Sequence, residues 1–290
     1  MTQATTMDDI VLSGINPAIY TEDDFREIAR MVRSEAGIVL SSGKAMLVYS
    51  RIAPLVRESS STTFAEYIAT LRHNDVQRRK TIEALTTNHT FFFRESHHFD
   101  HLGATVRPLL AAQLERDEPV RIWSAGCSSG EETWSLVLTL LGEDTAAGRK
   151  LVTRDLRVLA SDLSPRVLAK AAAARYAGDE VGEVPERLRA NWMRHDGQAV
   201  VLAEEARSIV RFRELNLLGE WPMQRAFDVI FCRNVMIYFD QPTKERLVSR
   251  FAEYLRPGGF LYIGHSERVS GPGEALLEPV GPTIYRRRGA

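Results

Sequence analysis

The chain has little cysteine. Cys127 and Cys232 are the only two cysteines in 290 residues, which is too few for a disulfide-stabilised scaffold or for a zinc site built on cysteine ligands. Both lie in apolar, strand-like surroundings, so we interpret them as buried thiols of a protein from a reducing compartment.

Long apolar runs are also missing. The first residues, MTQATTMDD, lack the basic stretch and apolar core of a secretory signal, and no later apolar run is long enough to span a bilayer. We therefore expect a cytoplasmic protein without membrane insertion, and we assign residues 1–20 to a loose leader.

Neither sign of charge is in excess. The formal net charge is −1, which argues against a generally basic nucleic-acid binder, and no N-P-P-Y motif of base methylation occurs. We expect no nucleic-acid partner. A hydrophobic content of 44% supplies enough core for one large domain or two.

Apolar residues at helical spacing fill the region after the leader. Gly37 is placed to end the first helix, and Thr63 with Glu66 has the spacing of a capping box. The stripes are Phe25, Ile28, Ala29 and Val32; Val48, Ile52 and Leu55; Phe64, Tyr67, Ile68 and Leu71; and Val76, Ile82 and Leu85. The pattern predicts a small helical bundle.

This bundle is rich in basic residues. Ten lie between Arg26 and Lys80, against five acidic ones. They form either a positive surface for an acidic partner helix or an ordinary solvated helix face.

The segment TTNHTFFFRE, residues 86–95, joins polar turn formers to three aromatic residues and an arginine. The aromatic rings are either core or the wall of a ligand pocket, whose polar groups would be Asn88, Thr90 and Arg94. The histidines that follow, His97, His98 and His101, lack the H-E-x-x-H order of a zinc site. We interpret them as helix-surface residues and predict no metal site.

Strands and helices alternate from residue 120 onward, after a linking helix that Pro108 would break or kink. Apolar runs at 120–125, 156–160 and 227–232 predict parallel strands, and the intervening stripes predict helices. Because ligands bind at the carboxyl ends of such strands, Asp162, Arg233 and Asn234 are candidate ligand residues. For Asp162 the alternative is an ordinary helix cap.

The turn AGCSSGEE, residues 125–132, follows the first of these strands. It does not match G-x-G-x-x-G, and it lacks the Lys-Ser/Thr of a phosphate loop. Glu131 and Glu132 would repel a pyrophosphate but suit a ribose or a cation. The turn is either structural or part of a site for a phosphate-free nucleoside such as S-adenosylmethionine.

Residues 177–216 interrupt the alternation. Short strands at 200–202 and 209–212 predict an inserted hairpin subdomain, and residues 278–285 suit a closing antiparallel hairpin.

Four segments together resemble a known family, the chemotaxis receptor glutamate methyltransferases of the CheR type. They are TTNHTFFFRE at 86–95, SAGCSSGEE at 124–132, CRNVMIYF at 232–239 and GHSE at 264–267. The resemblance covers nearly the whole chain. It departs from the family at Ser129, where Thr is common, and at Thr133 and Trp134, where Pro-Tyr is common.

The resemblance implies an α/β fold. A Rossmann-like methyltransferase domain at 119–290, with an inserted β subdomain near 194–214, would follow a helical receptor-recognition domain at 21–100 and a linker helix at 101–118. The family's substrate is a glutamate side chain on cytoplasmic chemoreceptor helices, and its products are a methyl ester and S-adenosylhomocysteine.

The resemblance also implies site residues. Arg94 and Tyr238 would face the substrate carboxylate. The residues expected to surround S-adenosylmethionine are Asn88, Thr90, Arg94, Glu131, Asp162, Asn216, Leu217, Arg233 and Asn234. The inserted hairpin looks shorter than in members that dock on a receptor's C-terminal pentapeptide, so we expect recognition that does not depend on it. An alternative function is a catalytically silent adaptor that binds an adenosine ligand.

Overall fold

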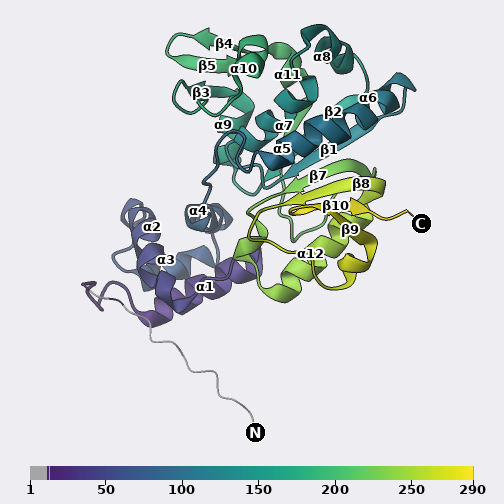
Figure 1. The fold of residues 1–290 in the computed structure, drawn as a ribbon. Coiled ribbons are helices and arrows are strands. Elements are labelled where there is room, and N and C mark those ends of the chain that lie inside the picture. Colours follow the sequence, from purple (N-terminus) through teal and green to yellow (C-terminus); the bar gives the residue numbers. More distant parts are fainter. Residues whose placement is uncertain (1–11, 13, 290) are drawn as a thin grey trace. The chain divides into compact units, whose positions relative to one another are not determined.

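A computed structural model describes residue 12 and residues 14–289 (Figure 1). Most of the predicted leader, residues 1–11 and 13, lies outside the described residues. The backbone divides into a helical unit, which runs to Thr87 and takes in Tyr238–Asp240, and an α/β unit, which comprises Asn88–Ile237 and the chain from Gln241 onward. Within the described part of the chain, no helix is both long and apolar enough to cross a membrane.

The helical unit packs amphipathic helices around an apolar centre. Gly37 adopts φ +70° and its N–H donates to the carbonyl oxygen of Arg33, so it ends the first helix as predicted. The capping box of Thr63 and Glu66 is confirmed. Val76, which we predicted to be apolar core, is 66% exposed. The helices are α1 (Glu22–Ala36), α2 (Ala45–Glu58), α3 (Phe64–Leu71) and α4 (Asp75–Leu85), with a 3-10 turn η1 (Ser42–Lys44) before α2.

A seven-stranded sheet forms the centre of the α/β unit. Its order is β6-β2-β1-β7-β8-β10-β9. The first five strands of this order run parallel, whereas β10 is antiparallel to both neighbours. The predicted closing hairpin is thereby confirmed. The strands are β1 (Val120–Ala125), β2 (Leu156–Asp162), β6 (Val210–Glu214), β7 (Phe227–Cys232), β8 (Leu255–Ile263), β9 (Leu277–Gly281) and β10 (Ile284–Arg287).

Helices cover both faces of this sheet (Figure 1). Phe99 of α5 stacks on Phe231 of β7 with ring centroids 5.9 Å apart, and Phe251 of α12 packs on Trp123 of β1 at 5.4 Å. Side chains alternate between the two faces along each strand, so α5 and α12 pack on opposite faces of the sheet. The helices are α5 (His97–His101), α6 (Arg107–Glu115), α7 (Glu131–Leu141), α8 (Thr145–Val152), α9 (Pro165–Ala173), α10 (Glu186–Trp192), α11 (Glu204–Ser208) and α12 (Gln241–Tyr254), with 3-10 turns η3 (Met236–Tyr238) and η4 (Pro272–Leu276).

The predicted linking helix continues α5. A π-helical segment, η2 (Leu102–Val106), joins α5 to α6, and Pro108 lies in the first turn of α6. Proline has no N–H for the carbonyl group four residues back. The helix therefore changes its hydrogen bonding next to Pro108.

A second, three-stranded sheet is inserted after β2, in the order β3-β5-β4. It consists of β3 (Arg175–Ala177), β4 (Met193–Asp196) and β5 (Ala199–Leu202). Our predicted hairpin of residues 200–202 with 209–212 is wrong, because residues 210–214 form β6 and pair with β2 in the large sheet. β4 and β3 take that place beside β5.

Candidate active site

The turn between β1 and α7 is shaped by two glycines. The N–H groups of Gly126 and Cys127 both donate to the carbonyl oxygen of Ser161, at 2.8 and 2.9 Å. Gly126 has φ +79°, and a Cβ on it would lie 2.4 Å from Cγ2 of Val235. Gly130 has φ +98° and is equally confined. Any side chain is therefore excluded at both positions, and a ligand can approach the main chain closely.

Asp162 ends β2 beside this turn. Its carboxylate accepts the N–H of Ser128 at 2.8 Å and the N–H of Ser164 at 3.0 Å. The helix cap of α9 is Ser164, whose hydroxyl accepts the N–H of Val167. Asp162 thus fixes the turn without being the cap of α9.

Two glutamates begin α7 and face different partners. Glu131 accepts a hydrogen bond from the Ser129 hydroxyl at 2.7 Å, and burial raises the pKa of its carboxyl group. Glu132 accepts from the Ser124 hydroxyl at 2.8 Å and contacts Arg233 at 3.3 Å. Burial also raises the pKa of Glu132, although Arg233 counteracts this effect.

The aromatic segment before α5 is bound to the same turn. The Ser128 hydroxyl donates to the carbonyl oxygen of Asn88 at 3.1 Å. Phe92 is fully buried and meets the ring of Tyr176 edge-on at 5.0 Å, and the N–H of Phe93 donates to Ser135 at 2.9 Å. Phe92 is therefore core, as one of our two interpretations held.

Arg94 lies on the outer side of this segment. Its Nη1 donates to the carbonyl oxygen of His89 at 2.9 Å, and its guanidinium lies 5.8 Å from the ring centroid of Phe91. Phe91 is 41% exposed. No other partner of the Arg94 side chain occurs among the described residues, so most of its donors are available to a ligand.

Arg233 and Asn234 follow the carboxyl end of β7. The Arg233 guanidinium contacts Glu95 and Glu132, each at 3.3 Å, and its Nη2 donates to the carbonyl oxygen of Arg94. The Asn234 amide donates to Glu95 at 3.2 Å. The structure thus brings the 88–95 segment, the start of α7 and the end of β7 together.

Glu267 fixes the loop after β7 from the other side. Its carboxylate accepts three main-chain N–H groups, from Gly264 at 2.6 Å, Asn234 at 3.1 Å and Ile237 at 3.2 Å. Burial raises its pKa, and these bonds counteract the effect. The sequence had matched GHSE to the family without assigning this glutamate a role.

Asn216 and Leu217 lie close to Asp162, because the preceding residue, Leu215, donates its N–H to the Asp162 carbonyl oxygen at 3.0 Å. Leu217 is 7% exposed. Thr90 is half-buried in the 88–95 segment. Tyr238 belongs to the helical unit, where its hydroxyl group donates to the carbonyl oxygen of Thr87 at 3.4 Å.

Of the three histidines, His98 contradicts our prediction of surface residues, whereas His97 and His101 are half-buried. His98 is fully buried, with Nε2 2.9 Å from the Thr283 hydroxyl. His101 bonds the Tyr262 hydroxyl at 2.8 Å. The rings of His98 and His101 lie toward the residue just before β10 and toward β8, which the sequence could not reveal.

The residues around the turn fit S-adenosylmethionine. The carboxylates of Glu131 and Asp162 suit a ribose and a positive charge, and the glycine turn leaves no space for side chains over the main chain. A phosphate site would favour a Lys or Arg side chain in the turn. Residues 125–132 contain neither.

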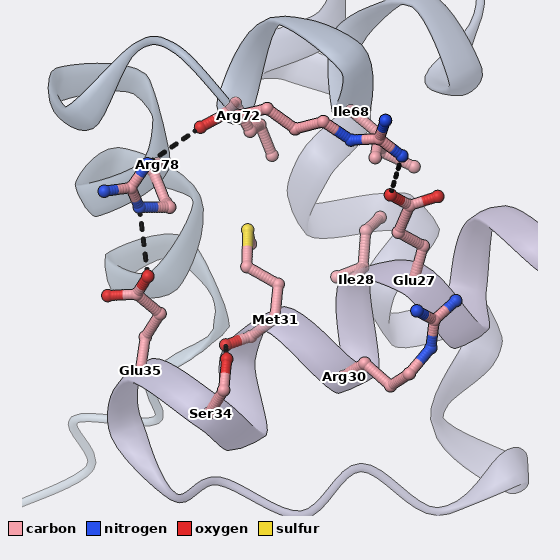
Figure 2. Close-up of a pocket in the computed structure, with 10 residues that line it drawn as sticks. Glu27, Ile28, Arg30, Met31, Ser34, Glu35, Ile68, Arg72 and Arg78 are labelled. Carbon is pink, nitrogen blue, oxygen red and sulfur yellow. Dashed lines mark hydrogen bonds and ion pairs between the residues drawn. The ribbon is translucent and has the colours of Figure 1, made fainter.

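The helical unit has a pocket of its own. A hollow of about 620 Å³ lies between α1, α3 and the start of α4. Figure 2 shows Met31 in this hollow between two ion pairs, Arg78 with Glu35 at 3.1 Å and Arg72 with Glu27 at 2.7 Å.

Known families match both units. Residues 88–283 match the family described as CheR methyltransferase, SAM binding domain, and residues 23–86 match the CheR methyltransferase all-alpha domain. These matches, with the mixed sheet and its covering helices, confirm the predicted α/β Rossmann-like fold with a helical N-terminal domain.

Individual relatives agree with this assignment. A probable chemotaxis protein methyltransferase of Rhizobium etli is 40% identical over 262 residues, which cover 88% of this chain and 96% of the relative. The chemotaxis protein methyltransferase of Escherichia coli K12 is 40% identical over 271 residues, covering 90% and 89%. Among solved structures, a TehB-like methyltransferase of Corynebacterium glutamicum aligns with a TM-score of 0.31 at 16% identity, covering 66% of this chain and 97% of that one; so weak a likeness adds nothing. The chain therefore belongs to the CheR family of chemotaxis methyltransferases, and its cofactor is S-adenosylmethionine.

Proposed function

We propose that this protein methylates glutamate side chains on the cytoplasmic helices of a chemoreceptor. The reaction consumes S-adenosylmethionine and gives a glutamate methyl ester and S-adenosylhomocysteine. The observation that carries the proposal is Arg94, whose guanidinium is anchored by one bond to His89 and keeps its other donors for a carboxylate. Family membership supports methyl transfer, and this arginine supports a carboxylate as the acceptor.

No general base is needed for this reaction. A glutamate carboxylate is already ionised at neutral pH, because its ordinary pKa is about 4.3. S-adenosylmethionine supplies an electrophilic methyl group on a cationic sulfur. The methyl–sulfur bond breaks as the methyl–oxygen bond forms, so the positive charge of the donor and the negative charge of the acceptor disappear together.

The task of the protein side chains is therefore alignment and exclusion of water. We propose that Arg94 and Tyr238 orient the substrate carboxylate by hydrogen bonds. An arginine that bound the carboxylate too strongly would weaken it as a nucleophile, so we assign Arg94 positioning and not activation.

The cofactor would be held by the residues around the glycine turn. Asp162, already fixed by two main-chain N–H groups, would accept a ribose hydroxyl. Glu131 would lie near the remaining polar or cationic groups. The other residues of the proposed cofactor-binding set are Asn88, Thr90, Arg94, Asn216, Leu217, Asn234 and the main chain at Arg233.

A labelling experiment tests this function. Receptor-containing membranes are incubated with the protein and S-adenosylmethionine labelled in the methyl group, and base-labile methyl ester on the receptor is measured. Arg94→Ala should cut turnover by about a hundredfold, whereas Arg116→Ala, an exposed arginine of the same unit paired with Glu118, should leave it unchanged. Cofactor binding without any ester would favour the silent adaptor instead.

We propose that the helical unit supplies the receptor-recognition surface. Basic residues of this unit without an ion pair or side-chain hydrogen bond in the described part of the chain are Arg30, Lys44, Arg57, Arg79 and Lys80. In contrast, Arg72 and Arg78 beside the pocket are already paired with glutamates (Figure 2). Unpaired cations suit the acidic face of a receptor helix. Receptor binding should therefore weaken as the salt concentration rises, which a binding titration would check.

We also propose that recognition does not require a receptor's C-terminal pentapeptide. The observation behind this is the short β4–β5 hairpin, which turns at Gly197 with φ +65°. Calorimetric titration with a receptor tail peptide should give no heat of binding. Tight binding would refute this part of the proposal.

A further inference from the structure

A buried arginine joins three segments of the active site. The Arg233 side chain is 2% exposed. Its Nη1 bonds Glu132 of α7, its Nη2 bonds the Arg94 carbonyl oxygen and contacts Glu95, and its guanidinium lies 5.4 Å from the ring centroid of Phe99. The guanidinium is thus enclosed by neighbouring segments, although its Nε has no hydrogen-bond partner among the described residues. Its position indicates that it holds neighbouring segments together.

Glu95 is the second junction of this network. One carboxylate oxygen accepts from the Asn234 amide at 3.2 Å and contacts Nδ1 of His265 at 2.9 Å. The other oxygen lies 3.3 Å from Arg233 and 3.6 Å from Nδ1 of His98. Glu95 thus connects both residues that follow β7 to the segment that carries Arg94.

The backbone around this network is strained. Phe93, Glu95 and Asn234 have φ values of +54°, +58° and +59°, in the left-handed region that costs a residue other than glycine on the order of 1 kcal/mol. Such conformations persist only where surrounding bonds hold them. The hydrogen bonds and ion pairs of Glu95 and Arg233 join these strained residues to their neighbours.

We propose that Glu95 is a positioning residue for methyl transfer, and that Arg233 acts through its bond network with Glu95 and Glu132 instead of touching the cofactor with its guanidinium. The expected effect of Glu95 on turnover rests on the proposed function, whereas its expected effect on cofactor binding does not. Replacing the Glu95 carboxylate removes a charge partner of Arg233 and lets the Phe93–Glu95 backbone relax, and Arg94 moves with it.

The test compares Glu95→Gln with a matched buried carboxylate. Asp228 lies at the opposite end of the same strand, β7, is 3% exposed, and pairs with Arg256 at 2.7 Å and with the N–H of Arg121. Asp228→Asn therefore reports the loss of the charge of a buried carboxylate, whose partner Arg256 is 41% exposed, far along the strand from Arg233. For each variant we would measure the thermal midpoint, the Kd for S-adenosylhomocysteine by calorimetry, and kcat and KM with receptor membranes.

Both variants should lower the thermal midpoint. Glu95→Gln should also weaken S-adenosylhomocysteine binding about tenfold and lower kcat more than it changes the KM for receptor, since misplacement of about 1 Å costs up to a hundredfold in rate. Asp228→Asn should leave Kd and kcat near the wild-type values. Glu95→Asp, which keeps the charge, should recover part of the lost affinity, and it carries the comparison if Glu95→Gln does not fold.

A double-mutant cycle tests the assignment of Arg233. If the two residues act as one unit, Glu95→Gln combined with Arg233→Met should weaken S-adenosylhomocysteine binding no more than Arg233→Met alone. Additive losses would overturn the assignment, as would an unchanged Kd in folded Glu95→Gln. If the wild-type protein forms no receptor ester, the proposed function fails, yet the Kd values still decide this inference.

Discussion

Acid should destabilise the α/β unit through His98. This side chain is fully buried on α5, and its Nε2 bonds the Thr283 hydroxyl at 2.9 Å. Burial, reinforced by the positive charges of Arg233 and His97, lowers the pKa of His98 from its ordinary 6.5 to about 3. The carboxylate of Glu95, 3.6 Å away, counteracts this only in part. The imidazole is therefore neutral in the folded protein above that pH.

The direction of the effect follows from proton uptake. In the unfolded chain His98 takes up a proton as pH falls through 6.5, whereas in the folded protein it does not do so until about pH 3. Between pH 6.5 and pH 3, the unfolded state therefore gains stability over the folded state by about 1.4 kcal/mol for each pH unit of acidification. From pH 7 to pH 5 the folded state should lose about 2 kcal/mol from this group alone.

The assay is urea unfolding at pH 7 and pH 5 for the wild-type protein, His98→Gln and His195→Gln. Glutamine keeps a hydrogen-bonding side chain but does not titrate, so His98→Gln should remove about 2 kcal/mol of the pH dependence even if it is less stable at both values. His195 is exposed, and its replacement should leave the slope as it is. Equal slopes for wild type and His98→Gln would refute the reasoning, and so would imidazole NMR that shows His98 protonated at pH 5.

Three further changes test other parts of the structure. Gly126→Ala places a Cβ 2.4 Å from Val235, at a residue with φ +79°. Calorimetry should therefore show S-adenosylhomocysteine binding weakened about tenfold or more. Normal affinity would contradict the proposal that the glycine turn holds the cofactor. Asp162→Asn replaces an acceptor of two main-chain N–H groups by an amide with one acceptor atom, and the same titration should detect a loss of about tenfold. Arg51→Met removes donors to the carbonyl oxygens of Leu85 and Thr86 at the end of α4 and should cost about 1 kcal/mol in denaturant unfolding with no change in cofactor affinity.

Local signals in the sequence predicted local structure well. The left-handed Gly37 and the capping box of Thr63 and Glu66 both depend on interactions within a few residues of the chain. The strand runs at 120–125 and 227–232 were equally clear because both faces of a parallel sheet are buried.

Pairing between distant strands was not predictable in the same way. Residues 210–214 have the pattern of a strand, but a strand pattern does not name its partner. We paired them with the nearest earlier strand in the chain, β5, whereas they lie in register with Val158–Asp162 of β2. The same limit applies to His98, whose burial depends on Thr283 and Tyr262, residues that are far away in the sequence.

The direction of a side chain at the end of a strand was not predictable from the sequence. The sequence located Arg233 at the carboxyl end of β7, and this place together with the family resemblance made it an expected cofactor-binding residue. Past Cys232 the chain leaves the sheet, so the alternation that orients strand residues no longer applies. In the structure the guanidinium contacts Glu95 and Glu132, each at 3.3 Å. A buried guanidinium needs such partners wherever it lies, so a strand-end arginine with two glutamates in neighbouring motifs indicates an internal junction at least as strongly as a ligand contact.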